Sequence, residues 1–439
     1  MNITSILSSI EEAPLQSHRL RFLLYCHDTF GLGHLRRTLS LAEHFTSALP
    51  NAEVLIVTGS PVAHTFSLPT RTDYVKLPVV TKQGNGTYKA RDISLDFASI
   101  LDLRAAILRE TARAYHPDVF LVDHAPNGLK GEALPALTLL QATQPDCLRV
   151  LGLRDIIDAS HIIRQNWAKE GIYRTLEYTY DRILVYGSPY LYNIGAEYGL
   201  SSTVSQQIHY CGYLDRLEDT HVNENEAQKD AYTPSLEYPH ALCDRPLVVL
   251  TAGGGGDGFP LMQAYLIGLQ RQSSVHFNSV LLAGPLMPRE ELRQLHELAA
   301  NLPGDQVRIE KFLPDPLPLL NAADLVVAMA GYNTTCELLA LRKRMLLIPR
   351  SVPRQEQLIR ASILTQHGLA HMLHPERLAP LRLLDSVYNA LEQPRPQQRQ
   401  LDDADIIFHG QRTALEVIVD DLLHRHHDHL NSLVEAAKV

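Results

Sequence analysis

The feature that most constrains the fold is a strand–helix–strand–helix pattern at residues 324–361. It begins with a valine-rich run, Leu325 to Met329, which is typical of a strand buried on both faces. A helical pattern follows from Thr334, a second apolar run spans Met345 to Pro349, and another helical pattern spans Gln355 to Leu364. Alternation of this kind predicts an α/β domain with a parallel sheet.

The same alternation runs through most of the chain and predicts two Rossmann-like domains. The 439 residues are many for one core, so two domains of roughly 200 residues are expected. We predict a leader at 1–19, an N-terminal domain at 20–215, a polar linker at 216–245, a C-terminal domain at 246–395 and a helical segment at 396–439. The predicted strands begin at Arg21, Val54, Tyr74, Pro117, Leu148 and Arg182, and then at Pro246, Val280, Val307, Leu325 and Met345.

Composition excludes several classes of function. The formal net charge of −9 argues against a nucleic-acid backbone as the main partner. No apolar run approaches the roughly 18 residues of a membrane span, and the N-terminus lacks a secretory-signal pattern. We therefore expect a cytoplasmic protein, with peripheral membrane association left open. The five cysteines are odd in number and lack C-x-x-C spacing, so buried reduced thiols are expected, with no metal site.

Residues suited to nucleotide binding follow the run that starts at Leu325. Gly331 ends the strand, Thr334 offers a helix N-cap, and Glu337 lies three residues later, as in a capping box. Glu337 is then either a capping residue or a carboxylate that accepts both hydroxyls of a ribose. The helix start, at Thr334 and Thr335, could hold phosphate through its N–H groups. The Glu356–Gln357 pair at the same sheet edge favours the functional interpretation.

A glycine run follows the strand that starts at Pro246. Its backbone N–H groups could face phosphate oxygens, although Asp257 would repel phosphate unless its side chain points away. The run matches neither a Walker pattern nor G-x-G-x-x-G with a later acid, so ATPase and dehydrogenase functions lose their main support. A loop that binds no ligand is the alternative. The glycines are Gly253, Gly254, Gly255 and Gly256.

A G-L-G-H motif follows the first predicted strand. Gly31 and Gly33 would let the chain turn sharply, and His34 begins a helix. A histidine with a near-neutral pKa can take a proton from an acceptor hydroxyl, and a carboxylate on its other ring nitrogen would fix the tautomer. Asp123, at the end of its own strand, is the best candidate for that carboxylate.

Alternatives remain open for this N-terminal site. His124 is a rival for the catalytic role, and Asp123 could instead cap a helix. Arg154 and Asp155 follow the strand that starts at Leu148, and they could serve an acceptor or form a structural ion pair.

Three motifs together resemble GT-B glycosyltransferases of the MurG-like branch, which includes the peptidoglycan N-acetylglucosaminyltransferase. They are A-G-Y-N-T-T-C-E, P-R-Q-E-Q-L-I-R-A and the G-x-G-H-x-x-R form that ends at Arg37. The resemblance implies two domains facing a cleft, with the final helical segment returning to the first domain. It also implies that Glu337 binds ribose, that Glu356 and Gln357 read the donor sugar, and that the glycine run holds the diphosphate. The backbone at Phe312 and Leu313 would then recognise the base.

The function implied is transfer of a sugar from a nucleoside diphosphate, uridine rather than thymidine, to an acceptor hydroxyl that the sequence does not identify. The G-x-G-H loop would lie on the acceptor side. No D-x-D pair is placed for a cation, so we expect a metal-independent, inverting reaction without a cofactor beyond the nucleotide sugar. A nucleotide-sugar hydrolase or epimerase of the same fold, and a non-catalytic nucleotide-sugar-binding protein, are the alternatives.

Overall fold

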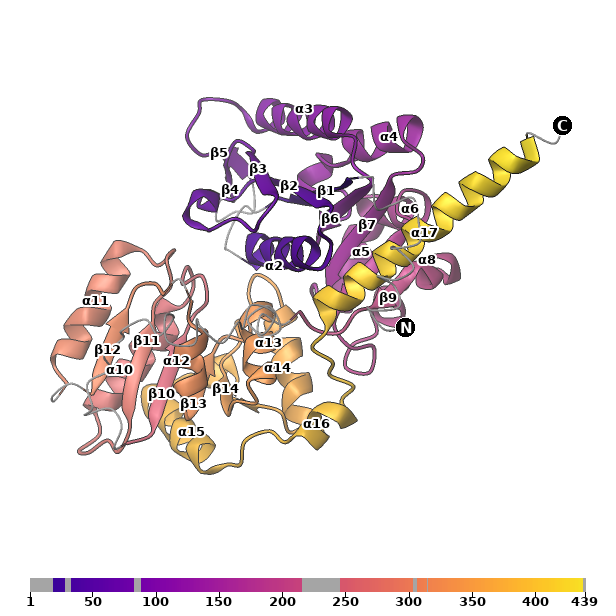
Figure 1. Cartoon of the computed structure of the whole chain (residues 1–439). Helices are drawn as coiled ribbons and strands as arrows, with labels where there is room; N and C mark the ends of the chain where they lie inside the picture. The colour runs from indigo at the N-terminus through magenta and orange to yellow at the C-terminus, as the bar shows by residue number, and fades with distance from the viewer. Residues whose placement is uncertain are drawn as a thin grey trace. The chain divides into compact units, whose positions relative to one another are not determined.

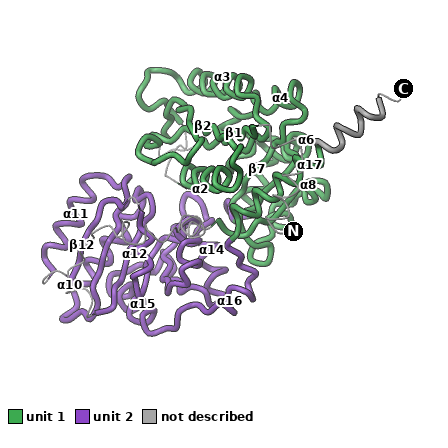
Figure 2. The backbone as a smooth tube through the Cα atoms, viewed as in Figure 1, with its two compact units in different colours: residues 1–155, 160–214, 409–439 green, residues 156–159, 215–408 purple. Residues whose placement is uncertain are grey.

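The structure is a computed structural model that describes residues 19–27, 33–82, 88–214, 245–302, 306–313 and 315–436. The chain divides into two compact units (Figure 2). Unit 1 comprises residues 1–155, 160–214 and 409–439, and unit 2 comprises residues 156–159 and 215–408. Residues 1–18 of the predicted leader, residues 216–244 of the predicted linker and Gly31 lie outside the described residues.

Unit 1 is built on a seven-stranded parallel sheet in the order β3-β2-β1-β6-β7-β8-β9 (Figure 1). Its central strands are almost wholly buried, as expected for parallel strands with both faces covered. The chain fills one side of β1 first and then returns to the other side, so the strand order reverses between β1 and β6. The strands are β1 (Leu20–Cys26), β2 (Ala52–Thr58), β3 (Thr72–Lys76), β6 (Val119–Asp123), β7 (Leu148–Arg154), β8 (Arg182–Tyr186) and β9 (Ile208–Tyr210).

The C-terminal helix α17 (Gly410–Ala436) belongs to unit 1. Arg182 of β8 donates to Asp421 of α17 at 2.8 Å, and Gln411 donates to Ser40 of α2 at 2.9 Å. The other helices of unit 1 are α2 (Gly33–Ala48), α3 (Phe97–Tyr115), α4 (Leu134–Thr143), α5 (Ser160–Lys169), α6 (Ile172–Tyr178), α7 (Ile194–Tyr198) and α8 (Ser202–Gln207), with 3-10 turns η2 (Ala63–Thr65) and η3 (Leu129–Gly131).

Unit 2 repeats the plan with a six-stranded parallel sheet in the order β12-β11-β10-β13-β14-β15. Its strand order reverses between β10 and β13. The strands are β10 (Leu247–Thr251), β11 (Asn278–Leu282), β12 (Val307–Glu310), β13 (Leu325–Ala328), β14 (Met345–Leu347) and β15 (His371–Met372). The helices are α10 (Phe259–Gln270), α11 (Arg289–Ala300), α12 (Leu317–Ala322), α13 (Tyr332–Ala340), α14 (Glu356–Gln366), α15 (Pro380–Glu392) and α16 (Gln398–Asp403), with the 3-10 turn η6 (Pro375–Arg377).

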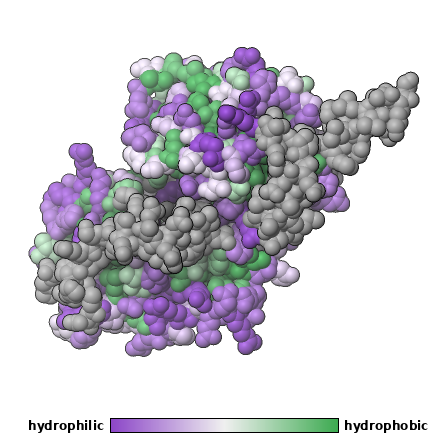
Figure 3. All heavy atoms as spheres, in the orientation of Figure 1, coloured by the Kyte–Doolittle hydropathy of each residue, from purple (hydrophilic) through white to green (hydrophobic). Residues whose placement is uncertain are grey.

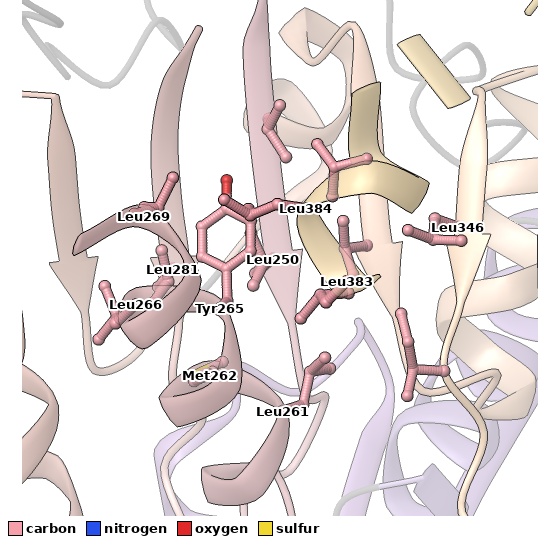
Figure 4. Close-up of a cluster of buried hydrophobic side chains, with 14 of the residues drawn as sticks. Leu250, Leu261, Met262, Tyr265, Leu266, Leu269, Leu281, Leu346, Leu383 and Leu384 are labelled. Atoms are coloured by element: carbon pink, nitrogen blue, oxygen red, sulfur yellow. The ribbon is translucent and has the colours of Figure 1, made fainter. Parts of the chain in front are cut away.

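The core of unit 2 lies where α10 and α15 pack against the sheet (Figure 4). Leucines of β10, β11 and β14 meet Met262 and Leu266 of α10 and Leu383 of α15. The hydroxyl of buried Tyr265 pairs with Ser279 at 2.8 Å, so this aromatic residue meets its polar requirement inside the core. This packing fixes the positions of the neighbouring strand ends.

The predicted fold class, two parallel-sheet α/β domains, is confirmed, and most predicted strands and helices are present within a few residues. Outside the two main sheets, β4 (Val80–Lys82) and β5 (Tyr88–Ala90) form a two-stranded antiparallel sheet.

The prediction that Thr334 caps a helix is wrong. Helix α13 begins at Tyr332 with Gly331 at the N-cap, so Thr334 lies inside its first turn. Glu337 is therefore too far along the helix to complete a capping box with Thr334. The capping interpretation of Glu337 is excluded.

Both units carry polar surfaces. Hydrophilic residues predominate at the margins of the face shown in Figure 3, with apolar residues interspersed. Among the described residues, no helix is long and apolar enough to cross a membrane. Cys26, Cys147, Cys211 and Cys336 are buried thiols, as predicted, and Cys243 lies outside the described residues.

Candidate functional site

The first group of polar residues lies in unit 1, where the strand order reverses. β1 and β6 are paired neighbours, with Tyr25 opposite Val122, so their carboxyl ends lie side by side. His27 follows β1, Asp123 ends β6, and α2 starts at Gly33. Ligands of open α/β sheets bind at such a reversal point.

His34, Asp123 and Arg37 form a compact hydrogen-bonded cluster at this point. His34 Nδ1 lies 2.6 Å from Asp123 Oδ2. The Arg37 guanidinium, one helical turn along α2, binds both carboxylate oxygens of Asp123, each at 2.7 Å. Asp123 and Arg37 are almost fully buried, whereas the His34 side chain keeps 16% of its surface exposed. His34 is thus the member of the cluster that a substrate can reach.

The surroundings fix the protonation of the cluster. Burial lowers the pKa of His34 to about 4, against the opposing effect of Asp123. Burial alone would raise the pKa of Asp123, but the Arg37 guanidinium and the His34 hydrogen bond hold it well below its usual range. Near neutral pH the imidazole is therefore neutral and the carboxylate charged. The proton on Nδ1 faces Asp123, which leaves Nε2 as a hydrogen-bond acceptor.

Two further histidines flank His34. The ring centroid of His27 lies 4.7 Å from that of His34, and the ring centroid of His124 lies 5.0 Å from it on tilted planes. His124 has a left-handed backbone, with φ of 67°, which is uncommon outside glycine. Asp123 contacts His34 directly, whereas His124 packs on its ring. No side chain caps η3, so the helix-cap interpretation of Asp123 is not supported.

The predicted acceptor-side residues lie one strand further along the edge. β7 pairs with β6, and Arg154 ends β7 with its Nη2 3.3 Å from His124 Nε2. Asp155 is buried and accepts a hydrogen bond from the hydroxyl of Tyr213 at 3.4 Å. Gly33 is the exposed first residue of α2. Arg154 therefore joins the cluster through His124, and Asp155 has a structural contact.

The second group of polar residues lies at the reversal point of unit 2, beside the glycine run. The run connects β10 to α10, and Thr251 at the end of β10 lies opposite Ala328 of β13. Gly255 has a φ of 87°, and a Cβ there would lie 2.2 Å from the carbonyl oxygen of Ala283, so only glycine fits. Gly253 also has a positive φ, 60°, yet a Cβ there would meet nothing within 4 Å. Part of the loop is thus tightly packed and part borders open space.

The turn from β13 to α13 also combines a residue of positive φ with a position that borders open space. Ala330 has a left-handed backbone with φ of 61°, and Arg360 donates to its carbonyl oxygen at 2.9 Å. Gly331 has an ordinary backbone conformation, and a Cβ there would meet nothing within 4 Å. The N-cap residue Gly331 has no side chain, so no N-cap side chain closes the start of α13.

Helix α13 carries two buried polar side chains behind Gly331. Glu337 is 5% exposed and Thr335 is 2% exposed, while Thr334 is only partly buried. The Thr335 hydroxyl has no hydrogen-bond partner within the described part of the chain. Helix starts without side-chain caps and polar groups at a reversal point suit an anionic, hydroxyl-rich ligand.

Arg350 links the glycine run to the Glu356–Gln357 pair. Its Nη1 lies 2.6 Å from Asp257 Oδ2, and its Nη2 lies 3.0 Å from Glu356 Oε1. Its backbone N–H donates to Gln357 Oε1 at 3.1 Å. Burial would lower the pKa of Arg350, but the Glu356 and Asp257 carboxylates raise it above its usual value. The charge of Asp257, which is unfavourable for a phosphate site, is therefore paired.

The residues expected to meet the base lie further along the same edge. Phe312 and Leu313 follow β12, which is two strands away from β10. Phe312 is 39% exposed, and the preceding residue accepts a hydrogen bond from Gly284 at 2.9 Å. Pro314, the next residue in the chain, lies outside the described residues.

Sequence reasoning missed Arg350, Arg360 and His27. Arg360 lies in the P-R-Q-E-Q-L-I-R-A motif but was given no role, and no motif marks Arg350 or His27. The contacts of such residues join positions far apart in the chain, as with Arg350 and Asp257. Among the described residues, no group of three or more histidines, cysteines or carboxylates could hold a metal ion.

Comparison with known proteins shows what the region around this site resembles. Residues 249–412 match the family described as "Glycosyltransferase family 28 C-terminal domain". This region contains the glycine run, Gly331, Glu337 and the Glu356–Gln357 pair.

Curated relatives and solved structures make the resemblance more specific. The chain is 27% identical over 188 residues to an Exiguobacterium UDP-N-acetylglucosamine–N-acetylmuramyl-(pentapeptide) pyrophosphoryl-undecaprenol N-acetylglucosamine transferase, covering 42% of this chain and 50% of that protein. It is 36% identical over 101 residues to the Streptococcus uberis enzyme of the same name, covering 23% and 27%. The chain thus spans about half the length, or less, of these curated relatives.

The whole fold has solved counterparts. The kitacinnamycin glycotransferase superimposes with a TM-score of 0.60 at 16% identity, covering 92% of this chain and 100% of that chain. Acinetobacter baumannii MurG gives 0.53 at 12% identity, covering 92% and 99%. The Staphylococcus aureus MnaA–UDP complex gives 0.55 at 12% identity, covering 90% of each. The chain has the GT-B glycosyltransferase fold, and its predicted resemblance to the MurG-like branch is confirmed.

Proposed function

We propose that this protein is a glycosyltransferase that moves a sugar from a uridine diphosphate donor to an acceptor hydroxyl. One observation carries the proposal: the glycine run, Gly331 and the Glu356–Gln357 pair share one sheet edge, inside the region that matches a glycosyltransferase domain. The relatives named above use a UDP-N-acetylglucosamine donor, which supports a UDP-linked sugar.

We assign the donor to unit 2. The N–H groups of the glycine run and of the first turns of α10 and α13 would bind the diphosphate, because no side chain caps either helix. Glu337 would accept the ribose hydroxyls, Glu356 and Gln357 would bind the sugar, and the backbone at Phe312 and Leu313 would recognise the base. Thr334 and Thr335, in the first turn of α13, would complete the phosphate side.

We assign the catalytic base to His34 of unit 1. Its neutral imidazole would take the proton of the acceptor hydroxyl at Nε2 while Asp123 stabilises the imidazolium that forms. The acceptor oxygen bonds to the anomeric carbon as the bond from that carbon to the diphosphate oxygen breaks. The diphosphate leaves with the bonding electrons, stabilised by backbone N–H groups in place of a metal ion. One direct displacement of this kind inverts the anomeric centre.

For the acceptor and the cellular location, we propose only a class. The named relatives act on a lipid-linked saccharide, and an acceptor of that class would place the protein on the cytoplasmic face of a membrane. A small-molecule or saccharide acceptor is equally compatible with the His34 site, and Gly33, Arg37 and Arg154 would lie on its acceptor side.

Product analysis tests the proposal. UDP-N-acetylglucosamine and related nucleotide sugars are incubated with the protein, with and without candidate acceptors, and UDP and glycosides are separated by chromatography. The His34→Ala variant should lose at least about 100-fold in turnover without loss of UDP affinity. The matched control is His296→Ala, on the exposed face of α11, which should be unaffected. Equal turnover in the two variants would refute His34 as the base.

A nucleotide-sugar hydrolase is the second candidate, because a buried neutral imidazole can activate water as well as a sugar hydroxyl. It would release UDP and free sugar at the same rate whether or not an acceptor is present. An epimerase of this fold would release UDP with an altered sugar. A non-catalytic binding protein would keep its ligand affinity in His34→Ala and show no turnover in either form.

A further inference from the structure

In the described part of unit 2, Arg350 joins Asp257, which directly follows the glycine run, to both members of the Glu356–Gln357 pair. Its guanidinium lies 2.6 Å from Asp257 and 3.0 Å from Glu356, and its backbone N–H lies 3.1 Å from the Gln357 oxygen. The exposed fraction of the side chain is 26% for Arg350, 4% for Glu356 and 38% for Asp257. The contact is thus partly shielded from water, where charge pairing has more effect than on an open surface.

The charges at this point are unfavourable for an anion unless Arg350 is present. Asp257 is the one acidic residue of the segment 252–258, and it lies two residues before the start of α10. Asp257 and Glu356 supply two negative charges, and Arg350 supplies one positive charge between them. Without the guanidinium, a diphosphate would lose the one positive charge that lies between these two carboxylates and would be repelled by them.

Arg350 also fixes the geometry of the pair. The guanidinium binds one oxygen of Glu356, and the main-chain N–H binds the carboxamide oxygen of Gln357. Both contacts come from one residue in the segment that follows β14. A change in this residue would therefore alter the charge and the orientation of the site together.

We propose that Arg350 is a positioning residue that cancels the charges of Asp257 and Glu356 and so makes the glycine run selective for a nucleoside diphosphate over the monophosphate or the nucleoside. This inference rests on the proposed function, because it assumes that unit 2 binds a nucleotide. It adds that the affinity for the second phosphate depends on a side chain outside the glycine run and outside the Glu337 helix.

Calorimetric titration of the full chain with UDP, UMP and uridine tests the proposal, with the wild type and Arg350→Gln compared. We expect Arg350→Gln to weaken UDP binding by about tenfold or more, UMP binding less, and uridine binding little. The defect should shrink at high salt, since added ions screen the unpaired carboxylates. Equal UDP affinity in the two proteins, or an equal loss for all three ligands, would overturn the proposal.

Removal of the opposing charge provides the matched control. In the Arg350→Gln, Asp257→Asn double variant, most of the UDP affinity should return, because the repulsion is relieved. A purely structural role of Arg350 predicts no recovery, and that result would overturn the proposal. Arg350→Lys keeps the positive charge but cannot contact Asp257 and Glu356 through two guanidinium nitrogens. It should therefore retain more UDP affinity than Arg350→Gln.

If Arg350→Gln does not fold, the single variant Asp257→Asn tests the proposal in its place. This substitution lies at a partly exposed position, and it should tighten UDP binding severalfold while leaving uridine binding unchanged. Unchanged UDP binding would count against the inference. Failure of the proposed function looks different, because the wild type would then bind neither UDP nor any other nucleoside diphosphate.

Discussion

The two units share one topology and use it differently. In each unit the first strand lies in the middle of a parallel sheet, and the strand order reverses beside it, at β1 and β6 in unit 1 and at β10 and β13 in unit 2. Unit 1 places the neutral imidazole of His34 there, beside the buried ion pair of Asp123 and Arg37. Unit 2 places glycines and uncapped helix starts there, with carboxylates paired to Arg350.

The difference suggests a division of tasks. A proton transfer needs a side chain whose pKa and tautomer are fixed, which the Arg37–Asp123 pair provides for His34. A diphosphate needs N–H groups and room, which glycine provides. Substitutions should therefore act through charge in unit 1 and through backbone space in unit 2.

The largest effect on stability is expected for Asp123→Asn. This change leaves the buried Arg37 guanidinium without its carboxylate, and breaking a buried ion pair costs about 3–5 kcal/mol. The free energy of unfolding, measured by urea denaturation, should fall by this amount. The control is Glu290→Gln, which removes an exposed partner of Arg293 and should change stability little. Similar small losses in both variants would show that the pair in unit 1 is not a stabilising element.

A glycine pair in unit 2 provides the next comparison. Gly255→Ala must adopt a φ of 87° and brings Cβ to 2.2 Å from a carbonyl oxygen, so we expect a loss of about 2 kcal/mol or more. Gly331→Ala has an ordinary φ and no contact within 4 Å, so stability should stay the same or rise by about 0.5 kcal/mol. If the space at Gly331 receives the donor, Gly331→Leu should weaken UDP binding without a loss of stability. Unchanged UDP affinity in Gly331→Leu would place the donor elsewhere.

The sequence predicted the elements of both units better than their contacts. Short valine-rich runs and helical spacing identified most strands, and strand ends pointed to Glu337 and Asp123. That β1 and β6 are neighbours depends on where the chain crosses the sheet, which no local pattern encodes.

The wrong prediction for Thr334 and the missed pairing of Asp257 both arise from contacts between residues far apart in the chain. Thr334 resembled an N-cap, but the left-handed turn at Ala330 starts the helix earlier, and Arg360 donates to the carbonyl oxygen of that turn from a distant helix. The pairing of Asp257 with Arg350 spans 93 positions in the chain. Contacts at that separation are set by the packed sheet and leave no signal in the spacing of residues.

The smallest expected effect is the dependence of stability and activity on pH, which arises from His34 of unit 1. His34 has a folded pKa of about 4, below its ordinary 6.5, so the unfolded chain binds more protons between these values. The contribution of His34 to stability is therefore complete above pH 6.5 and is lost as pH falls toward 4. Wild-type protein should lose more stability than His34→Gln over this window. The acid limb of kcat/KM should lie near pH 4, and a limb at pH 6.5 would contradict the assigned burial effect.

The central claim is that unit 2 binds a nucleoside diphosphate through Glu337 and the glycine run, and isothermal titration calorimetry with UDP tests it most directly. We predict that UDP binds the wild type and that Glu337→Ala weakens this affinity by about tenfold or more, because hydrogen bonds to a charged group are lost. The control Glu376→Ala, at an exposed position in the same unit, should bind UDP as the wild type does. No binding of UDP or thymidine diphosphate by the wild type, or equal affinity in Glu337→Ala, would contradict the claim.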